Sequence, residues 1–272
     1  MADRTTKEML RELGAALDIV DGWESLTATL SGAWKTEPGS DFEGDDMATH
    51  PYNASPAAWA AMTAAVSHLL CLRESLFRRR DPNTVVVRLH THAQLTLIRG
   101  ALENAAVAVW LMHPDERTVR VLRRLQQEYD EVRQLDVAAK LAGLPAERSL
   151  EDRLGELSEL ATAAGASASS IKNRPGYEKI VGASGHLVPV GSKMTQLIWK
   201  AGSAIAHGEM RALFIYLRTR SLGEPSPGMH LGHVAGNVEL LVLGGLTAIQ
   251  MNKVAFDLYR RRRTAPSGSP SA

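Results

Sequence analysis

A single histidine in the segment SAIAHGEMRA, residues 203–212, is the strongest candidate for chemistry in this sequence. Lys200, Ser203, His207 and Arg211 are spaced three, four and four residues apart, so a continuous helix would place them on one face. Positive neighbours disfavour the protonated imidazole, which leaves His207 able to accept a proton as a base. A lysine or arginine beside it could stabilise negative charge that develops on a phosphate. The spacing predicts a catalytic set of His207, Lys200 and Arg211, with a solvated polar face as the alternative.

Two opposite charges lie inside the apolar segment AQLTLIRGALENAAVAVWLM, residues 93–112. Arg99 and Glu103 are four residues apart, so they lie on the same face of a helix. Burying either charge without a partner is costly, and we therefore expect the two to pair. Two interpretations stay open, a structural ion pair or the floor of a polar pocket. For the second, the candidate ligand-binding residues are Arg99, Glu103 and Ser203.

The sequence offers no convincing site for a metal or a cofactor. His90 and His92 are two residues apart and would point in different directions from a helix. The acidic segment DFEGDD, residues 41–46, lacks the oxygen spacing of an EF-hand, and we expect it to be a loop. The one cysteine, Cys71, lies in an apolar stretch and is expected in the core. We expect no metal and no cofactor.

The elements that must position these residues are predicted to be helices, because apolar residues recur three and four apart along most of the chain. The expected helices cover residues 5–30, 55–80, 84–112, 116–142, 148–163, 192–220 and 233–262. The connection over 165–192 is unusually long, and such connections are commonly functional or mobile. The prediction is an all-α bundle of six to seven helices. Its expected parts are an N-terminal helix and acidic loop over 1–50, a helical bundle domain over 51–262 and a disordered tail over 263–272.

Composition and charge exclude several classes of protein. The chain has 272 residues, of which 44% are hydrophobic and 22% charged, and this excludes global disorder. A formal net charge of +1 argues against nucleic-acid binding driven by charge alone. The charged N-terminal segment is unlike a signal peptide, and charges interrupt the longest apolar stretch. We expect a cytoplasmic protein that contacts no membrane.

Three segments together resemble a family of all-helical proteins from actinobacteria, over about residues 55–220. They are AVSHLLCLRESL, TLIRGALENAAVAVWLMHPDERTVRVLRRL and WKAGSAIAHGEMRAL. More distantly, a basic residue followed by a histidine on one helix is similar to the HEPN superfamily, whose α-helical bundles commonly cut RNA as dimers. The usual motif there is an arginine, four to six residues and a histidine. Here Lys200 stands in place of the arginine, and six residues separate it from His207. Ala201 stands where a polar residue is usual.

This resemblance implies an HEPN-like core and a metal-independent endoribonuclease of toxin or defence type, with RNA as its substrate and an antitoxin-like protein as a partner. Apolar surface on the expected helices 84–112 and 233–262, with the glycine-bearing face of 192–220, also predicts a homodimer. The alternative function is a non-catalytic helical module that binds a small ligand or a partner protein. Its binding site would be a polar pocket between helices, around Glu103 and His207.

Overall fold

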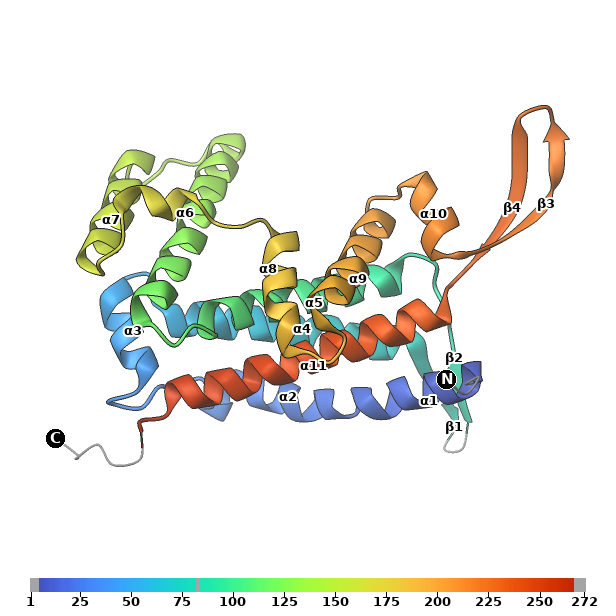
Figure 1. Ribbon diagram of the computed structural model, residues 1–272, viewed down its shortest axis with the longest axis horizontal. Coiled ribbons are helices and arrows are strands. Elements are labelled where there is room, and N and C mark those ends of the chain that lie inside the picture. Colours follow the sequence, from blue (N-terminus) through green and yellow to red (C-terminus); the bar gives the residue numbers. More distant parts are fainter. Residues whose placement is uncertain (1–4, 82–83, 267–272) are drawn as a thin grey trace.

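The computed structural model describes residues 5–81 and 84–266, and most of these residues are helical (Figure 1). The elements in chain order are α1 (Thr6–Leu17), α2 (Ile19–Thr27), η1 (Thr29–Ser31), α3 (Asp41–Thr49), α4 (Ala54–Leu76), β1 (Phe77–Asp81), β2 (Thr84–Val87), α5 (Ala93–Met112), α6 (Arg117–Ala142), α7 (Leu150–Ala163), η2 (Ala168–Lys172), α8 (Tyr177–Ser184), η3 (Gly185–Leu187), α9 (Gly191–Ala206), α10 (Met210–Tyr216), β3 (Arg218–Ser226), β4 (Met229–Ala235) and α11 (Val238–Arg263). The mostly helical class is confirmed. The helices are more numerous than the six or seven expected, and two small antiparallel hairpins accompany them.

Helix α5 is the centre of the main hydrophobic core. It packs against α4 and α11, while α1 and α2 cover one side and α8 and α9 the other (Figure 1). Most of its residues are buried, as expected for a helix that is apolar on every side. Two glycines in α11 allow the close approach of its neighbours. An added Cβ would lie 3.0 Å from Ile98 at Gly244 and 2.7 Å from Leu13 at Gly245.

A second, smaller hydrophobic cluster joins α6, α7 and η2 at one end of the molecule (Figure 1). Its buried members are Val121, Leu125, Val132, Leu157, Ala161 and Ile171. Side chains from α3 and the turn after it, among them Ala48 and Tyr52, pack against this cluster. The molecule therefore has two apolar centres, and α6 borders both, since it also contacts α5.

The segment expected as an acidic loop is a helix. Helix α3 begins after Ser40, whose hydroxyl accepts a hydrogen bond from the Glu43 backbone N–H at 3.2 Å. On its inner side, Asp45 is fully buried and receives two hydrogen bonds from Arg120, at 2.7 and 2.9 Å. Two acidic residues of this segment, Asp41 and Asp45, are thus partners for arginine. The expected N-terminal helix is also two helices, α1 and α2, and both contribute to the main core.

Other expected boundaries move where strands replace helix. The helix expected over 55–80 ends at Leu76, and the arginines after it form β1, which pairs with β2. The long connection over 165–192 contains η2, α8 and η3. The helix expected over 192–220 is divided into α9 and α10, and β3 and β4 follow as a hairpin that projects from the body (Figure 1). Cys71 is exposed on α4 and does not lie in the core.

Three helices, α4, α5 and α11, are long and apolar enough to cross a membrane by length and composition. In the structure the same three helices pack against one another to form the main core. The expectation that the protein contacts no membrane stays a prediction, as does its cytoplasmic location. Of the expected tail, Arg263 ends α11 and residues 267–272 lie outside the described part of the chain.

Candidate functional site

Helix α9 ends at the histidine that the sequence singled out. His207 is its C-cap, and Gly208 follows with φ +68°, in the left-handed region that favours glycine. The Gly208 N–H donates to the Ile205 carbonyl and the Glu209 N–H to the Ala204 carbonyl, both at 3.1 Å. These two bonds are a Schellman motif, which satisfies the last carbonyls of a helix. Gly208 therefore ends helix α9.

The expected polar face is therefore divided between two helices. Lys200 and Ser203 lie on α9, His207 is exposed at its end, and Arg211 is exposed in the first turn of α10. The Lys200 ammonium pairs with Glu178 of α8, at 3.2 Å between Nζ and Oε1. Lys200 is thus held toward α8, and Arg211 belongs to a separate helix from the other three. Because α9 ends at His207, the three expected catalytic residues do not share one continuous helix face.

Arg99 and Glu103 do pair, with 3.3 Å between Nη2 and Oε2. The same Glu103 oxygen accepts a hydrogen bond of 2.7 Å from Trp199 Nε1 of α9, and the Arg99 guanidinium lies 5.5 Å from the centre of the Trp199 ring. Their side chains keep 25% and 17% of their surface exposed. Gly202 makes the contact possible, because a Cβ there would lie 2.8 Å from the Arg99 Cβ. The pair joins α5 to α9 at a half-buried position, and Ser203 lies next to the contact glycine in sequence.

His68 extends this polar contact to α4. Its ring lies over Gly100, where an added Cβ would approach the imidazole Nε2 to 2.7 Å. Burial lowers the pKa of His68, and the nearby Glu103 carboxylate opposes that shift. Sequence spacing missed both His68 and Trp199, because each lies on a different helix from the charged pair.

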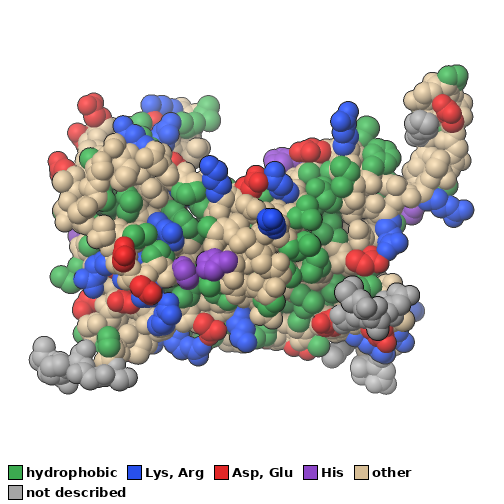
Figure 2. All heavy atoms as spheres, viewed as in Figure 1, with side chains coloured by type: hydrophobic (Ala, Val, Ile, Leu, Met, Phe, Trp, Pro, Cys, Tyr) green, Lys and Arg blue, Asp and Glu red, His purple; other side chains and the backbone are tan. Residues whose placement is uncertain are grey.

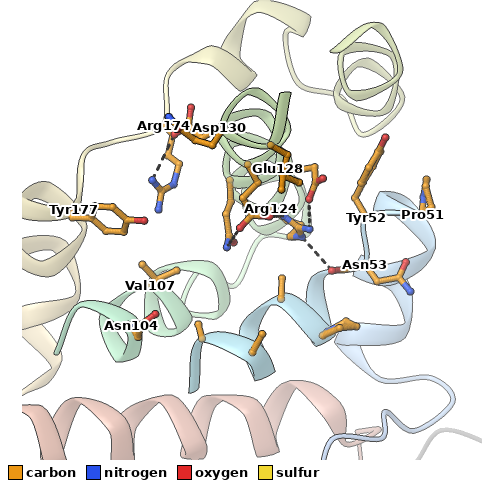
Figure 3. A pocket seen from close by; sticks show the side chains of 18 residues that line it. Pro51, Tyr52, Asn53, Asn104, Val107, Arg124, Glu128, Asp130, Arg174 and Tyr177 are labelled. Atoms are coloured by element: carbon orange, nitrogen blue, oxygen red, sulfur yellow. Dashed lines mark hydrogen bonds and ion pairs between the residues drawn. The ribbon is translucent and has the colours of Figure 1, made fainter. Parts of the chain in front are cut away.

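A cleft with polar walls lies elsewhere, between the main core and α6 (Figure 3). It has a volume of about 950 Å³ and opens beside the block formed by α6 and α7, where Figure 2 shows a hollow. Its floor comes from α4 and α5, one wall from α6, and the other from the segment before α8 (Figure 3). Among the residues that line the cleft are Asn53, Ala57, Ala60, Ala61, Val107, Arg124, Gln127, Glu128, Asp130, Glu131, Arg174 and Tyr177.

Two arginines from different elements face this cleft. Arg124 of α6 donates from Nη2 to Glu128 at 2.5 Å and from Nε to the Asn53 carbonyl at 3.2 Å. Arg174 lies between aromatic rings, 4.8 Å from the centre of Tyr177 and 6.0 Å from that of Trp110. Its Nη1 is 3.6 Å from an Asp130 carboxylate oxygen. The arginine side chains are only 8% and 9% exposed.

Several residues that line this cleft carry buried polar atoms without a hydrogen-bond partner. Seven buried side-chain nitrogen and oxygen atoms in the described part of the chain have no hydrogen-bond partner. Four of the seven belong to residues that line this cleft: Asn53 Oδ1, Arg124 Nη1, Gln127 Oε1 and Arg174 Nε. Buried polar atoms are normally satisfied, so a local group of unsatisfied ones calls for an explanation. A second cleft of about 980 Å³, beside α1 and β2, is lined by none of these atoms.

A half-exposed acid, Glu131, completes the wall of the cleft. Burial raises the pKa of Glu131, and the Arg124 guanidinium opposes that rise, with its Nη1 at 3.7 Å from Oε2. Gln127 donates from Nε2 to the other Glu131 oxygen at 2.8 Å. No prediction from the sequence included these α6 residues, although their spacing is a signal that could have found them. Arg124, Glu128 and Glu131 recur at four and three residues, which places them on one face.

Within residues 5–81 and 84–266 there is no group of three or more His, Cys, Asp and Glu side chains that could hold a metal ion. Comparison of the chain with protein-family models, with curated proteins and with solved structures finds no match in any of the three.

Proposed function

We propose that this protein is a non-catalytic helical module that binds a small molecule in the cleft between the α4–α5 floor and α6. The observation that carries the proposal is the group of four unsatisfied polar atoms in one cleft. The cleft volume of about 950 Å³ lies within the range of small-molecule sites. Its position between two hydrophobic clusters also supports the proposal, since ligand sites favour such boundaries.

The energetic argument is that a bound molecule supplies the missing partners. A buried donor or acceptor without a partner costs about 1–3 kcal/mol. A ligand with matching groups recovers part of that cost, and this recovery favours binding in the cleft, whose lining residues carry four of the seven such atoms in the described residues. The charged pair Arg99–Glu103 offers less, because Trp199 already satisfies the carboxylate. The binding site of the alternative function therefore moves from Glu103 and His207 to the neighbouring cleft, which Asn104 of α5 lines.

The test is a thermal-shift screen of common polar metabolites, with matched variants on α4. A ligand at 100 times its dissociation constant stabilises the folded state by about 2.7 kcal/mol, which raises Tm measurably. Ala61→Phe should fill the cleft and abolish the shift. Ala64→Phe, at a half-buried position on the same helix that does not line the cleft, should keep it. If Ala61→Phe does not fold, Gln134→Trp at the exposed rim replaces it.

A screen without any stabilising compound would contradict the proposal, and so would a shift that survives both cleft variants. Binding that Ala64→Phe abolishes as well would place the ligand outside the cleft.

The HEPN-like endoribonuclease stays a prediction, and it leads to a different expected result. It expects purified protein to cut single-stranded RNA in EDTA, with His207 as the base and Lys200 or Arg211 stabilising the charge on phosphate. The binding-module proposal expects intact RNA in the same assay. Cleavage by wild type that His207→Ala abolishes, with an unchanged circular-dichroism spectrum, would overturn the non-catalytic proposal. Equal cleavage by both proteins would indicate a contaminant.

A further inference from the structure

The cleft offers two hydrogen-bond donors that suit a carboxylate. Arg124 Nη1 and Arg174 Nε are nitrogens of almost fully buried guanidinium groups, and neither has an acceptor. Figure 3 shows the Arg174 side chain extending into the space between Tyr177 and α6. Guanidinium groups recognise carboxylates through charge-assisted bonds, so a small rotation of either side chain toward a bound carboxylate would supply the missing acceptor.

The same cleft offers acceptors that suit an ammonium group. Gln127 Oε1 has no donor, and the orientation of this amide is fixed because its nitrogen donates to Glu131. Asn53 Oδ1 is likewise without a donor. The Glu131 side chain is 47% exposed, and its nearest cation is Arg124 at 3.7 Å. Gln127 and Asn53 line the cleft together with the arginines, and Figure 3 shows the Asn53 side chain directed away from Arg124.

The balance of charge excludes a ligand of one sign. Among the lining residues, two arginines face three carboxylates, those of Glu128, Asp130 and Glu131. Glu128 is bound to Arg124 and Asp130 lies beside Arg174, so Glu131 is the carboxylate with the weakest pairing. A simple anion would meet this excess of negative charge, while a simple cation would leave both guanidinium donors without an acceptor.

The floor of the cleft is apolar and shallow. Ala57, Ala60, Ala61 and Val107 contribute only small side chains, and the ring of Tyr177 stands at the edge (Figure 3). Such a surface favours a flat or branched hydrocarbon body.

Building on the proposed function, we infer that the ligand is a zwitterion of amino-acid type. It carries a carboxylate for Arg124 and Arg174, an ammonium group for Glu131 and Gln127, and an apolar body that rests on the alanine floor. A free amino acid and a short peptide share this chemistry.

Three compounds that differ only in charged groups test the inference by isothermal titration calorimetry. L-phenylalanine carries both groups, 3-phenylpropionate lacks the ammonium, and phenethylamine lacks the carboxylate. L-phenylalanine should bind at least about ten times more tightly than either partner compound, a difference of 1.4 kcal/mol. The dipeptides Phe-Ala and Ala-Phe then distinguish the two sources, because tighter binding of one of them indicates a peptide.

Two cleft variants assign the groups, and each predicts a selective loss. Arg174→Gln should weaken L-phenylalanine and 3-phenylpropionate by about tenfold and leave phenethylamine unchanged. Glu131→Gln should weaken L-phenylalanine and phenethylamine and leave 3-phenylpropionate unchanged. Arg133→Gln is the matched control, since Arg133 is exposed on the same helix and does not line the cleft. Circular dichroism confirms that each variant is folded.

The possible failures are distinguishable. Equal binding of the three compounds, or equal losses for all of them in Arg174→Gln, would overturn the zwitterion and leave the cleft as a binding site. The same holds if none of these probes binds while other compounds from the metabolite screen do. If no compound binds at all, both the inference and the proposed function fail.

Discussion

Glu103 joins two helices through one carboxylate oxygen, and this contact makes a quantitative prediction. Glu103→Ala leaves the Trp199 Nε1 donor and the Arg99 guanidinium without their acceptor. We expect a loss of about 1–3 kcal/mol in the free energy of unfolding, the cost of an unsatisfied donor. A fully buried ion pair would lose more, about 3–5 kcal/mol, but these side chains remain partly exposed. Urea denaturation measures the change.

Glu103→Gln is the control for that substitution, because its amide oxygen still accepts from Trp199 and only the charge is lost. It should be less destabilising than Glu103→Ala. A urea midpoint that neither substitution moves would mean that the contact between α5 and α9 contributes nothing to stability.

Individual residues show where the sequence was informative. The pairing of Arg99 with Glu103 followed from their spacing, and the structure has it. Gly202 and Gly208 both lie in the segment expected to be one helix, and only Gly202 lies at a tight helix crossing. Gly208 has positive φ and open space around it, so it ends a helix. Spacing along one chain segment cannot reveal that difference, because both glycines occur in an otherwise helical pattern.

Helix α3 shows the same limit at the scale of an element. A glycine and four acidic residues in nine favour a loop by propensity, yet the segment is helical. Buried arginines from distant elements supply its stability. Arg262 donates to Asp41 at 2.7 Å and to Asp115 at 2.8 Å, although the arginines at the end of α11 were expected to be solvated. Tertiary ion pairs outweigh the loop propensity of the α3 segment. Their partners lie far apart in the sequence, so a local sequence pattern does not predict them.

Removing the Asp45 carboxylate, at the centre of this network, should lower the free energy of unfolding. Asp45→Ala leaves the almost fully buried Arg120 guanidinium without the two hydrogen bonds, of 2.7 and 2.9 Å, that it donates to the Asp45 carboxylate. We expect a loss of about 3–5 kcal/mol in the free energy of unfolding, because one partner of a buried ion pair remains uncompensated. Asp257→Ala, which removes an exposed pair with Arg260 on α11, should cost about 0–1 kcal/mol.

Chemical denaturation of both variants measures the difference. Equal losses in the two proteins would mean that the Asp45 contact is no stronger than a surface pair.

At the scale of the whole molecule, the helical class and the positions of α6, α7 and α11 were predictable from apolar spacing. The cleft was not, because its walls come from α4, α5, α6 and the segment before α8, which are far apart in the sequence. The sequence predicts that the long connection over 165–192 is functional or mobile. Arg174 and Tyr177 of the cleft lie within it. Long-range assembly, which a local pattern does not encode, decides which polar residues share a site.

The apolar faces of α5 and α11, from which the sequence predicts a homodimer, are buried in the main core, so we expect the interface of this predicted homodimer on α10 instead. Phe214 and Ile215 of α10 are 64% and 69% exposed, and Figure 2 shows hydrophobic side chains gathered over α9 and α10. The adjoining hairpin of β3 and β4 projects from the body and exposes Leu222 and Leu231. A two-stranded hairpin is marginally stable alone in water, so contact with a second copy would stabilise this arm.

Sedimentation equilibrium at micromolar concentration should therefore give twice the 29.5 kDa mass of the chain. Phe214→Asp places a charge in the expected interface and should shift the protein to monomer, because an unpaired charge is costly to bury. Leu141→Asp is the control, since Leu141 is 85% exposed on α6, at the other end of the molecule. A wild-type monomer, or a dimer that Phe214→Asp leaves intact, would show that α10 is not the interface. A dimer lost in Phe214→Asp and kept in Leu141→Asp would place α10 in the interface between the two copies.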